Sequence, residues 1–340
     1  MERYVMTCDT SASAFNAGGK APSDVNRILE GAGCRILRND YMLRNRILRL
    51  PLIVITPLIQ SFKIRRGSQL IFQHPYDTSH DAIRMMNRIL MFLLRHKKVT
   101  TAVLIHDVES IRFHEKNLRD EVDLLNKFDL IVAHSPEMKA LLVRNGLSSE
   151  CRVLGLFDYL VSAGNNMPRT RDGGVCYAGN LSKSRFLSCL PDIAGLEFYL
   201  YGTECDGLLK SSNIRYEGRF RSDDLSSLKG GWGLVWDGSF SSRAEGDLSD
   251  YLAYNSPHKT SMYVCAGMPV IVPTWSAVAD IVKEKNLGIV ISSLCDLPEA
   301  LHAVSEDEYA AMLESVERQA DDLKNGRQIL HALSGMIENA

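Results

Sequence analysis

The segment 254–272 has the pattern of a helix whose N-terminus can hold an anion. Ser256 is a suitable N-cap and Pro257 a suitable first helical residue, and a glycine follows the apolar run as a terminator. The first turn of such a helix offers free backbone N–H groups and a partial positive charge, with His258 and Lys259 beside them. The pattern is typical of a phosphate or diphosphate site, and it is also consistent with an ordinary capped core helix.

Three ionisable residues, His106, Asp107 and Glu109, follow an apolar segment at 102–105 that is expected to be a buried strand. Burying such groups without partners would be unfavourable, so their side chains should lie at an accessible end of the sheet. Each of them has the chemistry of a general base that takes a proton from a hydroxyl group, and the choice between them is open. The alternative is an ion pair with Arg112 that fastens a loop.

The neighbouring strand ends in the motif Phe-Gln-His-Pro-Tyr at 72–76. Its polar and aromatic side chains suit the lining of a pocket for an acceptor. The candidates for contact with an acceptor are His74, Tyr76 and Arg112.

A pair of glycines and a lysine stand between the first predicted strand and a helix expected at 24–31. Gly18 and Gly19 would let the backbone approach a ligand closely, and Lys20 adds positive charge, with Asn16 beside them. The motif is not G-x-G-x-x-G, and no acidic residue follows at the expected place, which disfavours a nicotinamide dinucleotide. A merely structural turn is the alternative interpretation.

Four strand ends in the second half of the chain combine basic, aromatic and small residues. They lie at 177–185, 199–202, 216–220 and 236–238, and the first of them is expected to open a helix at 183–190. Such residues gathered at one edge of a sheet suit a nucleotide diphosphate, whereas each aromatic by itself is as consistent with the core. The candidates for contact with this donor are Asn180, Lys183, Arg185, Tyr201, Gly202 and Asp237.

Short β-rich segments alternate with helical patterns, which predicts parallel sheets covered by helices on both faces. A polar stretch at 161–174, rich in glycine and asparagine, is expected to link a first domain at 1–160 to a second at 175–323. Residues 324–340 are expected to form a terminal helix, from 328 to 337, that packs back on the first domain. We therefore predict an α/β protein of two Rossmann-like domains that face a central cleft, with ligands at the carboxyl ends of the strands.

Composition favours an ordinary globular protein. The formal net charge of -2 over 340 residues gives no indication of nucleic-acid binding. The 8 cysteines are scattered without a C-x-x-C pair, which favours reduced thiols in the cytosol over a disulfide framework or a zinc site. The first residues lack a signal-peptide pattern, and the apolar stretch 48–59 is shorter than a membrane span, so we predict a cytoplasmic protein.

Positive charge is concentrated in the first third of the chain. Eight lysines and arginines fall within 35–66, and the apolar pattern at 84–98 carries Arg88, Arg95 and Lys97. A basic amphipathic helix can lie on an anionic membrane surface, here at its inner face. It is equally consistent with a packed helix whose arginines extend along apolar surface to water. Both interpretations are open.

Taken together, these motifs resemble a known group of enzymes. The chain is similar to bacterial GT-B glycosyltransferases of the β-1,6-galactofuranosyltransferase group, and also to the glucosyltransferases that extend N-acetylglucosamine on serine-rich-repeat adhesins. The likeness covers nearly the whole chain and is most specific in the second half. It rests on Leu-Tyr-Gly at 200–202, Gly-Leu-Val-Trp-Asp-Gly at 233–238, Tyr-Asn-Ser-Pro-His-Lys-Thr-Ser at 254–261, Ala-Gly-Met-Pro-Val-Ile at 266–271, Ile-His-Asp-Val-Glu-Ser-Ile-Arg at 105–112 and Leu-Phe-Asp-Tyr-Leu at 156–160.

The resemblance implies a UDP-sugar donor in the second domain, an acceptor in the first, association into homo-oligomers, and no required metal or other cofactor. Carried over to this sequence, it places Lys259 on the diphosphate together with His258 and Thr260. Lys183 or Arg185 would add positive charge there. The remaining donor contacts that it implies, at the sugar or uridine and across the cleft, come from Tyr254, Asn255, Ser256, Gly18, Gly19 and Lys20.

The predicted activity is the transfer of a hexose, with galactofuranose favoured, from a UDP-sugar to a hydroxyl of a glycan, glycolipid or glycoprotein in cell-surface polysaccharide synthesis. The predicted reaction is inverting, with Asp107 or His106 as the base. Three alternatives are open: a glucosyltransferase that extends N-acetylglucosamine on a glycosylated adhesin, a non-catalytic partner that binds a nucleotide sugar, and a nucleotide-sugar epimerase. The segments 72–76 and 239–248 depart from the family pattern, which leaves the identity of the sugar open.

Overall fold

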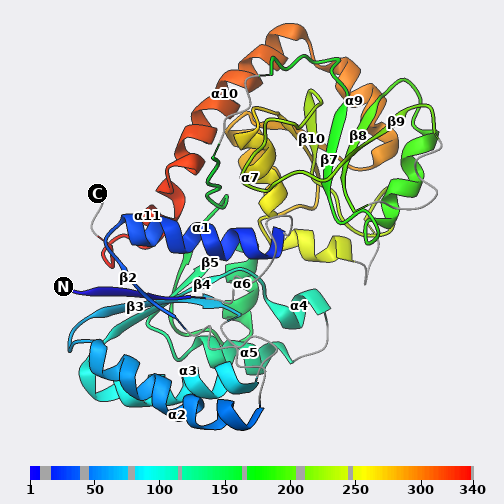
Figure 1. Cartoon of the computed structure of the whole chain (residues 1–340). Coiled ribbons are helices and arrows are strands. Elements are labelled where there is room, and N and C mark those ends of the chain that lie inside the picture. The colour runs from blue at the N-terminus through cyan, green and yellow to red at the C-terminus, as the bar shows by residue number, and fades with distance from the viewer. Residues whose placement is uncertain are drawn as a thin grey trace.

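The chain folds into two β-sheets of six strands each, with helices packed against both sheets (Figure 1). The computed structural model describes residues 1–7, 17–38, 46–75, 81–113, 117–162, 167–203, 211–243 and 248–337. Two of the predicted site residues, Asn16 and Tyr76, lie outside these ranges. Within both sheets every pair of neighbouring strands is parallel, as the alternation of strands and helices predicts.

The first sheet has the strand order β2-β1-β3-β4-β5-β6. Its central strands consist almost entirely of buried residues, as expected for a parallel sheet covered on both faces. The strands are β1 (Arg3–Met6), β2 (Arg35–Leu37), β3 (Gln69–His74), β4 (Thr100–Ile105), β5 (Leu130–Ala133) and β6 (Glu150–Val153). The helices are α1 (Ala17–Gly31), α2 (Arg46–Lys63), α3 (Asp81–Leu94), η1 (Arg95–Lys97), α4 (Glu109–Phe113), α5 (Leu118–Leu125) and α6 (Pro136–Arg144). In the described part of the chain, no helix combines the length and the apolar character that a membrane span requires.

The second sheet has the order β9-β8-β7-β10-β11-β12, so the winding direction of the chain reverses between β7 and β10. In open parallel sheets, the crevice for a ligand lies at such a switch point, beyond the carboxyl ends of the strands. The strands are β7 (Val175–Gly179), β8 (Phe198–Gly202), β9 (Ile214–Gly218), β10 (Trp232–Leu234), β11 (Val270–Pro273) and β12 (Gly288–Ile291). The helices are η2 (Arg185–Asp192), η4 (Leu248–Ala253), α7 (His258–Cys265), α8 (Ala279–Glu284), η5 (Leu294–Asp296), α9 (Leu297–Ala303), α10 (Glu306–Lys324) and α11 (Arg327–Ala332).

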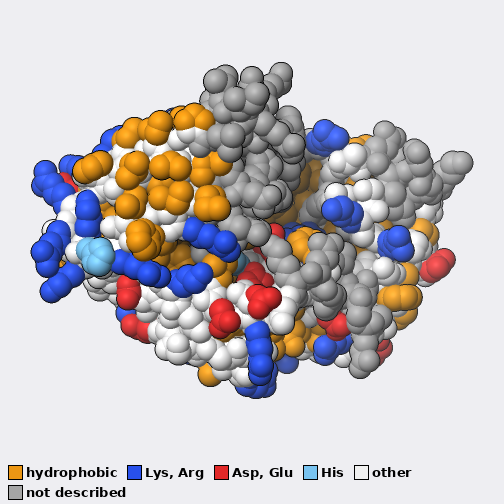
Figure 2. All heavy atoms as spheres, turned by 90° about the horizontal axis from the view of Figure 1, so that it is seen from below, with side chains coloured by type: hydrophobic (Ala, Val, Ile, Leu, Met, Phe, Trp, Pro, Cys, Tyr) orange, Lys and Arg blue, Asp and Glu red, His pale blue; other side chains and the backbone are white. Residues whose placement is uncertain are grey.

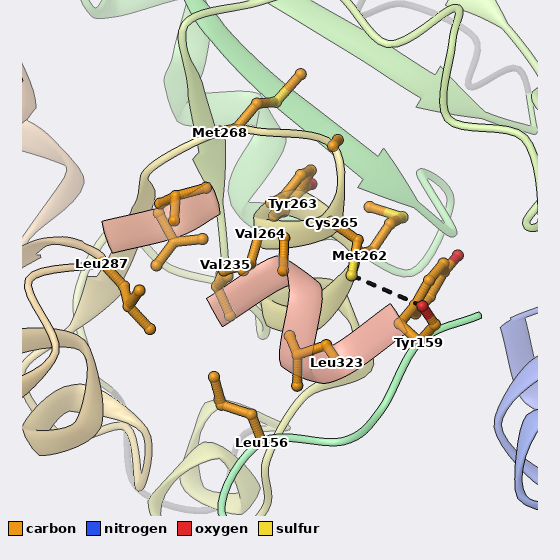
Figure 3. Packing of buried hydrophobic residues seen from close by; sticks show 14 of the residues in the cluster. Leu156, Tyr159, Val235, Met262, Tyr263, Val264, Cys265, Met268, Leu287 and Leu323 are labelled. Atoms are coloured by element: carbon orange, nitrogen blue, oxygen red, sulfur yellow. Dashed lines mark hydrogen bonds between the residues drawn. The ribbon is translucent and has the colours of Figure 1, made fainter. Parts of the chain in front are cut away.

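Helix α7 is held between the second sheet and segments from elsewhere in the chain. Figure 3 shows its side chains packed with Leu156 and Tyr159, which follow β6, and with Leu323 near the end of α10. The thiol of Cys265 donates to the carbonyl of Tyr159 at 3.7 Å (Figure 3). These contacts fix α7 from two sides, so its N-terminus has a defined position relative to the first half of the chain.

The end of the chain returns to the first sheet. Ile329 of α11 belongs to the same apolar cluster as Ile28 and Leu29 of α1. The carboxylate of Asp158 accepts hydrogen bonds from the backbone N–H groups of Gln328 at 3.1 Å and Ile329 at 2.7 Å, and it thereby satisfies the first turn of α11. This contact explains the aspartate of the motif at 156–160.

Three helices differ from the sequence-based expectation. Helix α1 begins at Ala17, seven residues early, so the glycine pair lies inside a helix and forms no turn. The segment after β7 winds as the 3₁₀ helix η2 and not as an α-helix at 183–190. Helix α11 ends at Ala332, although the pattern predicted a helix up to 337.

Candidate functional site

The site is built around the N-terminus of α7, beside the switch point of the second sheet. The helix begins at His258, and Pro257, with φ -65° and ψ 131°, is its N-cap. Ser256 therefore does not cap the helix, because the rigid proline ring holds the extended conformation one residue later than the pattern predicted. The other end agrees with the prediction: Gly267 has φ +77°, and the N–H of Met268 donates to the carbonyl of Tyr263 at 2.9 Å.

Five buried polar atoms at the start of α7 have no hydrogen-bond partner among the residues that the structure describes. They belong to consecutive or nearly consecutive positions of the chain. The atoms are Asn255 Oδ1, Ser256 Oγ, His258 Nε2, Thr260 Oγ1 and Ser261 Oγ. Leaving one such group unsatisfied costs about 1–3 kcal/mol, and folded proteins contain few of them. Their concentration at one helix N-terminus is typical of a site that a polar ligand completes.

Lys259 reaches back from the first turn of α7 to the switch point. Its ammonium donates to the hydroxyl of Tyr177 in β7 at 2.8 Å and to the carbonyl of Trp236, just beyond β10, at 3.2 Å. Gly179 leaves room for it, since a Cβ there would lie 3.2 Å from Lys259 Cε. Burial alone would lower the pKa of Lys259, but Tyr177 and the nearby Asp237 carboxylate raise it. Lys259 therefore keeps its positive charge at neutral pH, beside the switch point of the second sheet.

Three histidines surround the ring of Phe157 at the carboxyl ends of the first sheet. The ring centroids lie 5.7 Å apart for His106, 4.9 Å for His134 and 5.0 Å for His258. Burial lowers the pKa of His134 to about 4 and that of His258 to about 3, and it lowers the pKa of His106 well below its usual value. All three rings are therefore neutral at neutral pH, and they can act as hydrogen-bonding groups without adding charge.

The geometry assigns the protons of two of these rings. His134 donates through Nε2 to the carbonyl of Ile105 at 2.9 Å and accepts the backbone N–H of Ser256 on Nδ1 at 3.1 Å. His106 Nε2 lies 2.8 Å from Oε1 of Gln73. Because an amide oxygen only accepts, the proton of His106 is on Nε2, and its Nδ1 keeps a buried lone pair without a partner among the described residues.

Asp107 forms the ion pair with Arg112 that was the alternative interpretation of this motif. Oδ1 of Asp107 also accepts the hydroxyl of Tyr251 at 3.2 Å. Burial raises the pKa of Asp107, whereas Arg112 and Tyr251 oppose that rise. Arg112, which is predicted to contact the acceptor, is therefore engaged in an ion pair within the protein. The choice of the catalytic base among His106, Asp107 and Glu109 stays a prediction.

Glu121 is a buried residue of this region that sequence reasoning missed. Its carboxylate accepts the backbone N–H groups of Glu109 at 3.1 Å and Ser110 at 2.9 Å, and its Oε1 lies 2.6 Å from Nε2 of His74. Burial alone would raise the pKa of Glu121, but the bonds from His74 and Ser110 hold it at about 2. His74 therefore anchors a carboxylate through this nitrogen, and its predicted contact with an acceptor stays a prediction.

Lys20 is also engaged within the protein, and its predicted contact with a phosphate stays a prediction. Its ammonium forms a buried ion pair with Asp24, donates to the carbonyl of Leu160 at 2.5 Å and lies 4.5 Å from the ring centroid of Tyr159. Because α1 begins early, Lys20 and Asp24 stand four residues apart on one helix face. Gly18 and Gly19 precede them on the same helix.

Two further donor candidates, Tyr201 and Gly202, have structural roles. The hydroxyl of Tyr201 donates to the carbonyl of Ser227 at 2.8 Å and accepts the N–H of Lys229 at 2.9 Å within the core, and its predicted contact with the donor stays a prediction. Gly202 has φ +153°, and a Cβ there would lie 2.1 Å from the carbonyl oxygen of Gly179, so only glycine allows β8 to approach β7.

The remaining candidates lie beyond β7 and before α7. Asn180 Oδ1 accepts the Ser182 hydroxyl at 2.7 Å and thereby shapes the turn after β7. Lys183 and Arg185 follow that turn with exposed side chains. Tyr254 accepts the hydroxyl of Ser135, from the first half of the chain, on its carbonyl at 2.8 Å. The second-half candidates thus lie along the carboxyl-terminal edge of the second sheet, where the first half of the chain contacts them.

Comparison with known proteins agrees with this geometry. The chain is 28% identical to the β-1,6-galactofuranosyltransferase WbbI of Escherichia coli, over 74% of this chain and 75% of that one. It is 27% identical to glucosyltransferase 3 of Streptococcus gordonii, over 76% of each chain. The crystal structure of HepE from Anabaena in complex with UDP-glucose has a similar fold, with a TM-score of 0.61, 14% identity, and coverage of 98% of this chain and 100% of HepE.

The two parallel sheets and the similarity to HepE show the GT-B fold, and the two relatives show that the chain is a glycosyltransferase, which confirms the resemblance drawn from its motifs. Family models place it more narrowly. The N-terminal domain of the glucosyltransferase 3-like family matches residues 3–156, and the C-terminal domain of the same family matches residues 175–336. Because the two models together match most of the chain, the protein belongs to the glucosyltransferase 3-like family.

Proposed function

We propose that this glycosyltransferase transfers a hexose from a UDP-sugar to a hydroxyl group of a glycan acceptor. The observation that carries the proposal is the N-terminus of α7. Lys259, the positive end of the helix and the polar atoms at 255–261 that have no partner among the described residues together fit a diphosphate and the sugar attached to it. The complex of HepE with UDP-glucose supports a donor of this class.

The chemistry follows from the charge that develops as UDP departs. Lys259 and the helix N-terminus are already in place when the leaving group gains charge, so they stabilise the transition state without reorganisation. The five unpartnered atoms would gain partners from the diphosphate and the sugar. In this proposal the reaction is inverting and requires no metal.

The acceptor hydroxyl would lose its proton to a group at the end of β4. His106 offers a lone pair on Nδ1, and Asp107 offers a carboxylate whose pKa burial has raised. Both groups lie near the contact between the two halves of the chain, since Tyr251 of η4 bonds to Asp107 and Phe157 links His106 to His258.

Galactofuranose is the favoured sugar in this proposal, because WbbI is a β-1,6-galactofuranosyltransferase. Glucose is the second candidate, because the relative from Streptococcus gordonii is a glucosyltransferase and HepE was crystallised with UDP-glucose. The acceptor, in either case, is a glycan on a lipid, a polysaccharide or a protein.

A thermal-shift series tests the donor class and the sugar together. UDP-galactofuranose, UDP-glucose, UDP-galactose and UDP-N-acetylglucosamine are each added to the protein, and a ligand that binds the folded state raises its melting temperature. The largest shift identifies the donor, and release of UDP in the presence of an acceptor glycan separates transfer from mere binding. Absence of a shift with all four UDP-sugars would contradict the proposal.

A further inference from the structure

Helix α2 has an inverted distribution of polar and apolar side chains. Its polar residues Thr56 and Gln60 are 5% exposed, whereas the apolar side chain of Phe62 is 82% exposed. Two of the inward polar side chains donate hydrogen bonds to backbone carbonyls: Gln60 to that of Arg38 at 3.0 Å, and Ser61 to that of Leu58 at 2.8 Å. A surface helix ordinarily buries its apolar stripe, so the outward apolar side chains of α2 require another explanation.

Helix α3 lies beside α2 and extends the same surface (Figure 1). Phe92 of α3 is 63% exposed, and Met85 is also exposed. Figure 2 shows hydrophobic side chains forming a broad continuous area on this side of the molecule. We call this surface the α2–α3 face, and its exposed apolar residues are Val54, Ile55, Leu58, Ile59, Phe62, Met85 and Phe92. Contiguous exposed patches of this kind usually mark an interaction site.

The charge around the α2–α3 face is strongly positive. Residues 46–98 contain ten lysines and arginines against two aspartates and no glutamate, although the whole chain carries -2. Lysine and arginine side chains border the apolar area in Figure 2. The guanidinium of Arg95 lies 5.8 Å from the ring centroid of Phe92, and Lys63 and Arg88 are exposed on the same two helices. An apolar centre with a basic border is complementary to an anionic lipid surface.

We propose that the α2–α3 face docks the protein onto an anionic lipid bilayer. The apolar side chains enter the boundary between headgroups and acyl chains, and the basic border lies against the lipid phosphates. A second copy of the chain is a poorer occupant, because a two-fold interface through this face would place two basic borders against each other. The inference does not depend on the sugar or on the proposed reaction.

Flotation with lipid vesicles tests the proposal on the full chain. We expect binding to vesicles of equimolar phosphatidylglycerol and phosphatidylethanolamine, little binding to phosphatidylcholine vesicles, and weaker binding at high salt. The combined change Ile59→Ser, Phe62→Ser and Phe92→Ser should lower the apparent affinity roughly tenfold or more. Lys63→Glu with Arg88→Glu should weaken binding to the anionic vesicles in the same way.

The control is Val143→Ser, which removes an exposed apolar side chain from α6, away from this face, and should leave binding unchanged. Circular dichroism shows whether each variant folds, and all the substituted residues are exposed. The proposal is overturned if the wild type does not bind the anionic vesicles, or if the triple variant binds them equally well. A third outcome also overturns it: the wild type does not bind vesicles, and sedimentation without lipid shows that it forms an oligomer whereas the triple variant is a monomer. The α2–α3 face would then be a contact between copies of the chain.

Discussion

The hydroxyl of Tyr251 donates to Oδ1 of Asp107 at 3.2 Å and accepts the backbone N–H of Val108 at 3.0 Å. Tyr251 lies in η4, a few residues before α7, whereas Asp107 and Val108 follow β4. One hydroxyl thus joins the segment that leads to the proposed diphosphate site to the loop that carries the predicted base. The proposed diphosphate site and the predicted base come from different halves of the chain, and this contact holds the two segments together.

Tyr251→Phe should distinguish between the two predicted bases. Removing the hydroxyl takes away a hydrogen bond that favours the ionised form of Asp107, so the pKa of Asp107 should rise further. If Asp107 is the base, the acidic limb of the pH–rate profile should move to higher pH. If His106 is the base, that limb should stay where it is in the wild type. The measurement is the rate of UDP release as a function of pH, and Phe keeps the shape of the buried ring.

Lys259→Ala should reduce the rate of sugar transfer by roughly 100-fold or more, because it removes a positive charge placed at the departing diphosphate. Lys283→Ala is the matched control, since Lys283 is an exposed lysine in α8 of the same half. Steady-state release of UDP measures both variants. Turnover of Lys259→Ala at the wild-type rate would exclude the proposed role of Lys259.

Thr260→Val should have opposite effects on the free and the ligand-bound protein. The Thr260 hydroxyl is fully buried and has no partner among the described residues, so its removal should stabilise the free protein by about 1 kcal/mol. If a donor sugar or diphosphate completes that hydroxyl, the rise in melting temperature with the UDP-sugar should become smaller. Urea denaturation and thermal shift measure the two effects. A variant that is less stable when free, with an unchanged ligand shift, would contradict the assignment.

Acid should weaken the fold through His134. Burial lowers the pKa of His134 from 6.5 to about 4, so between these values the unfolded chain binds more protons than the folded one. The contribution of neutral His134 is therefore fully present above pH 6.5 and is lost as the pH falls toward 4.

The comparison with His134→Ala isolates this contribution. The difference in free energy of unfolding between the wild type and the variant should shrink by about 3 kcal/mol from neutral pH to the folded-state pKa of His134. Urea denaturation at a series of pH values gives this difference. A difference that stays constant over the range would show that His134 has an ordinary pKa in the folded protein.

The sequence alone was sufficient to predict those features of the fold that depend on residues close together in the chain. The alternation of strands and helices predicted two parallel sheets, and Ser135, whose side chain accepts the N–H of Met138 at 3.0 Å, begins α6 as its capping pattern indicated. Gly267 likewise ends α7 as expected. Capping residues, terminators and apolar periodicity act within a few positions, so they can be recognised in the sequence before the fold is known.

Only the tertiary structure decided which polar groups are engaged within the protein and which are available. His74 meets Glu121 across 47 positions of the chain, Tyr251 meets Asp107 across 144, and Ser256 meets His134 across 122. No local sequence pattern predicts such partners, because each of these contacts forms only when segments far apart in the chain pack together. The same holds for the outward face of α2, where apolar residues surround the helix and only packing selects the side that faces water.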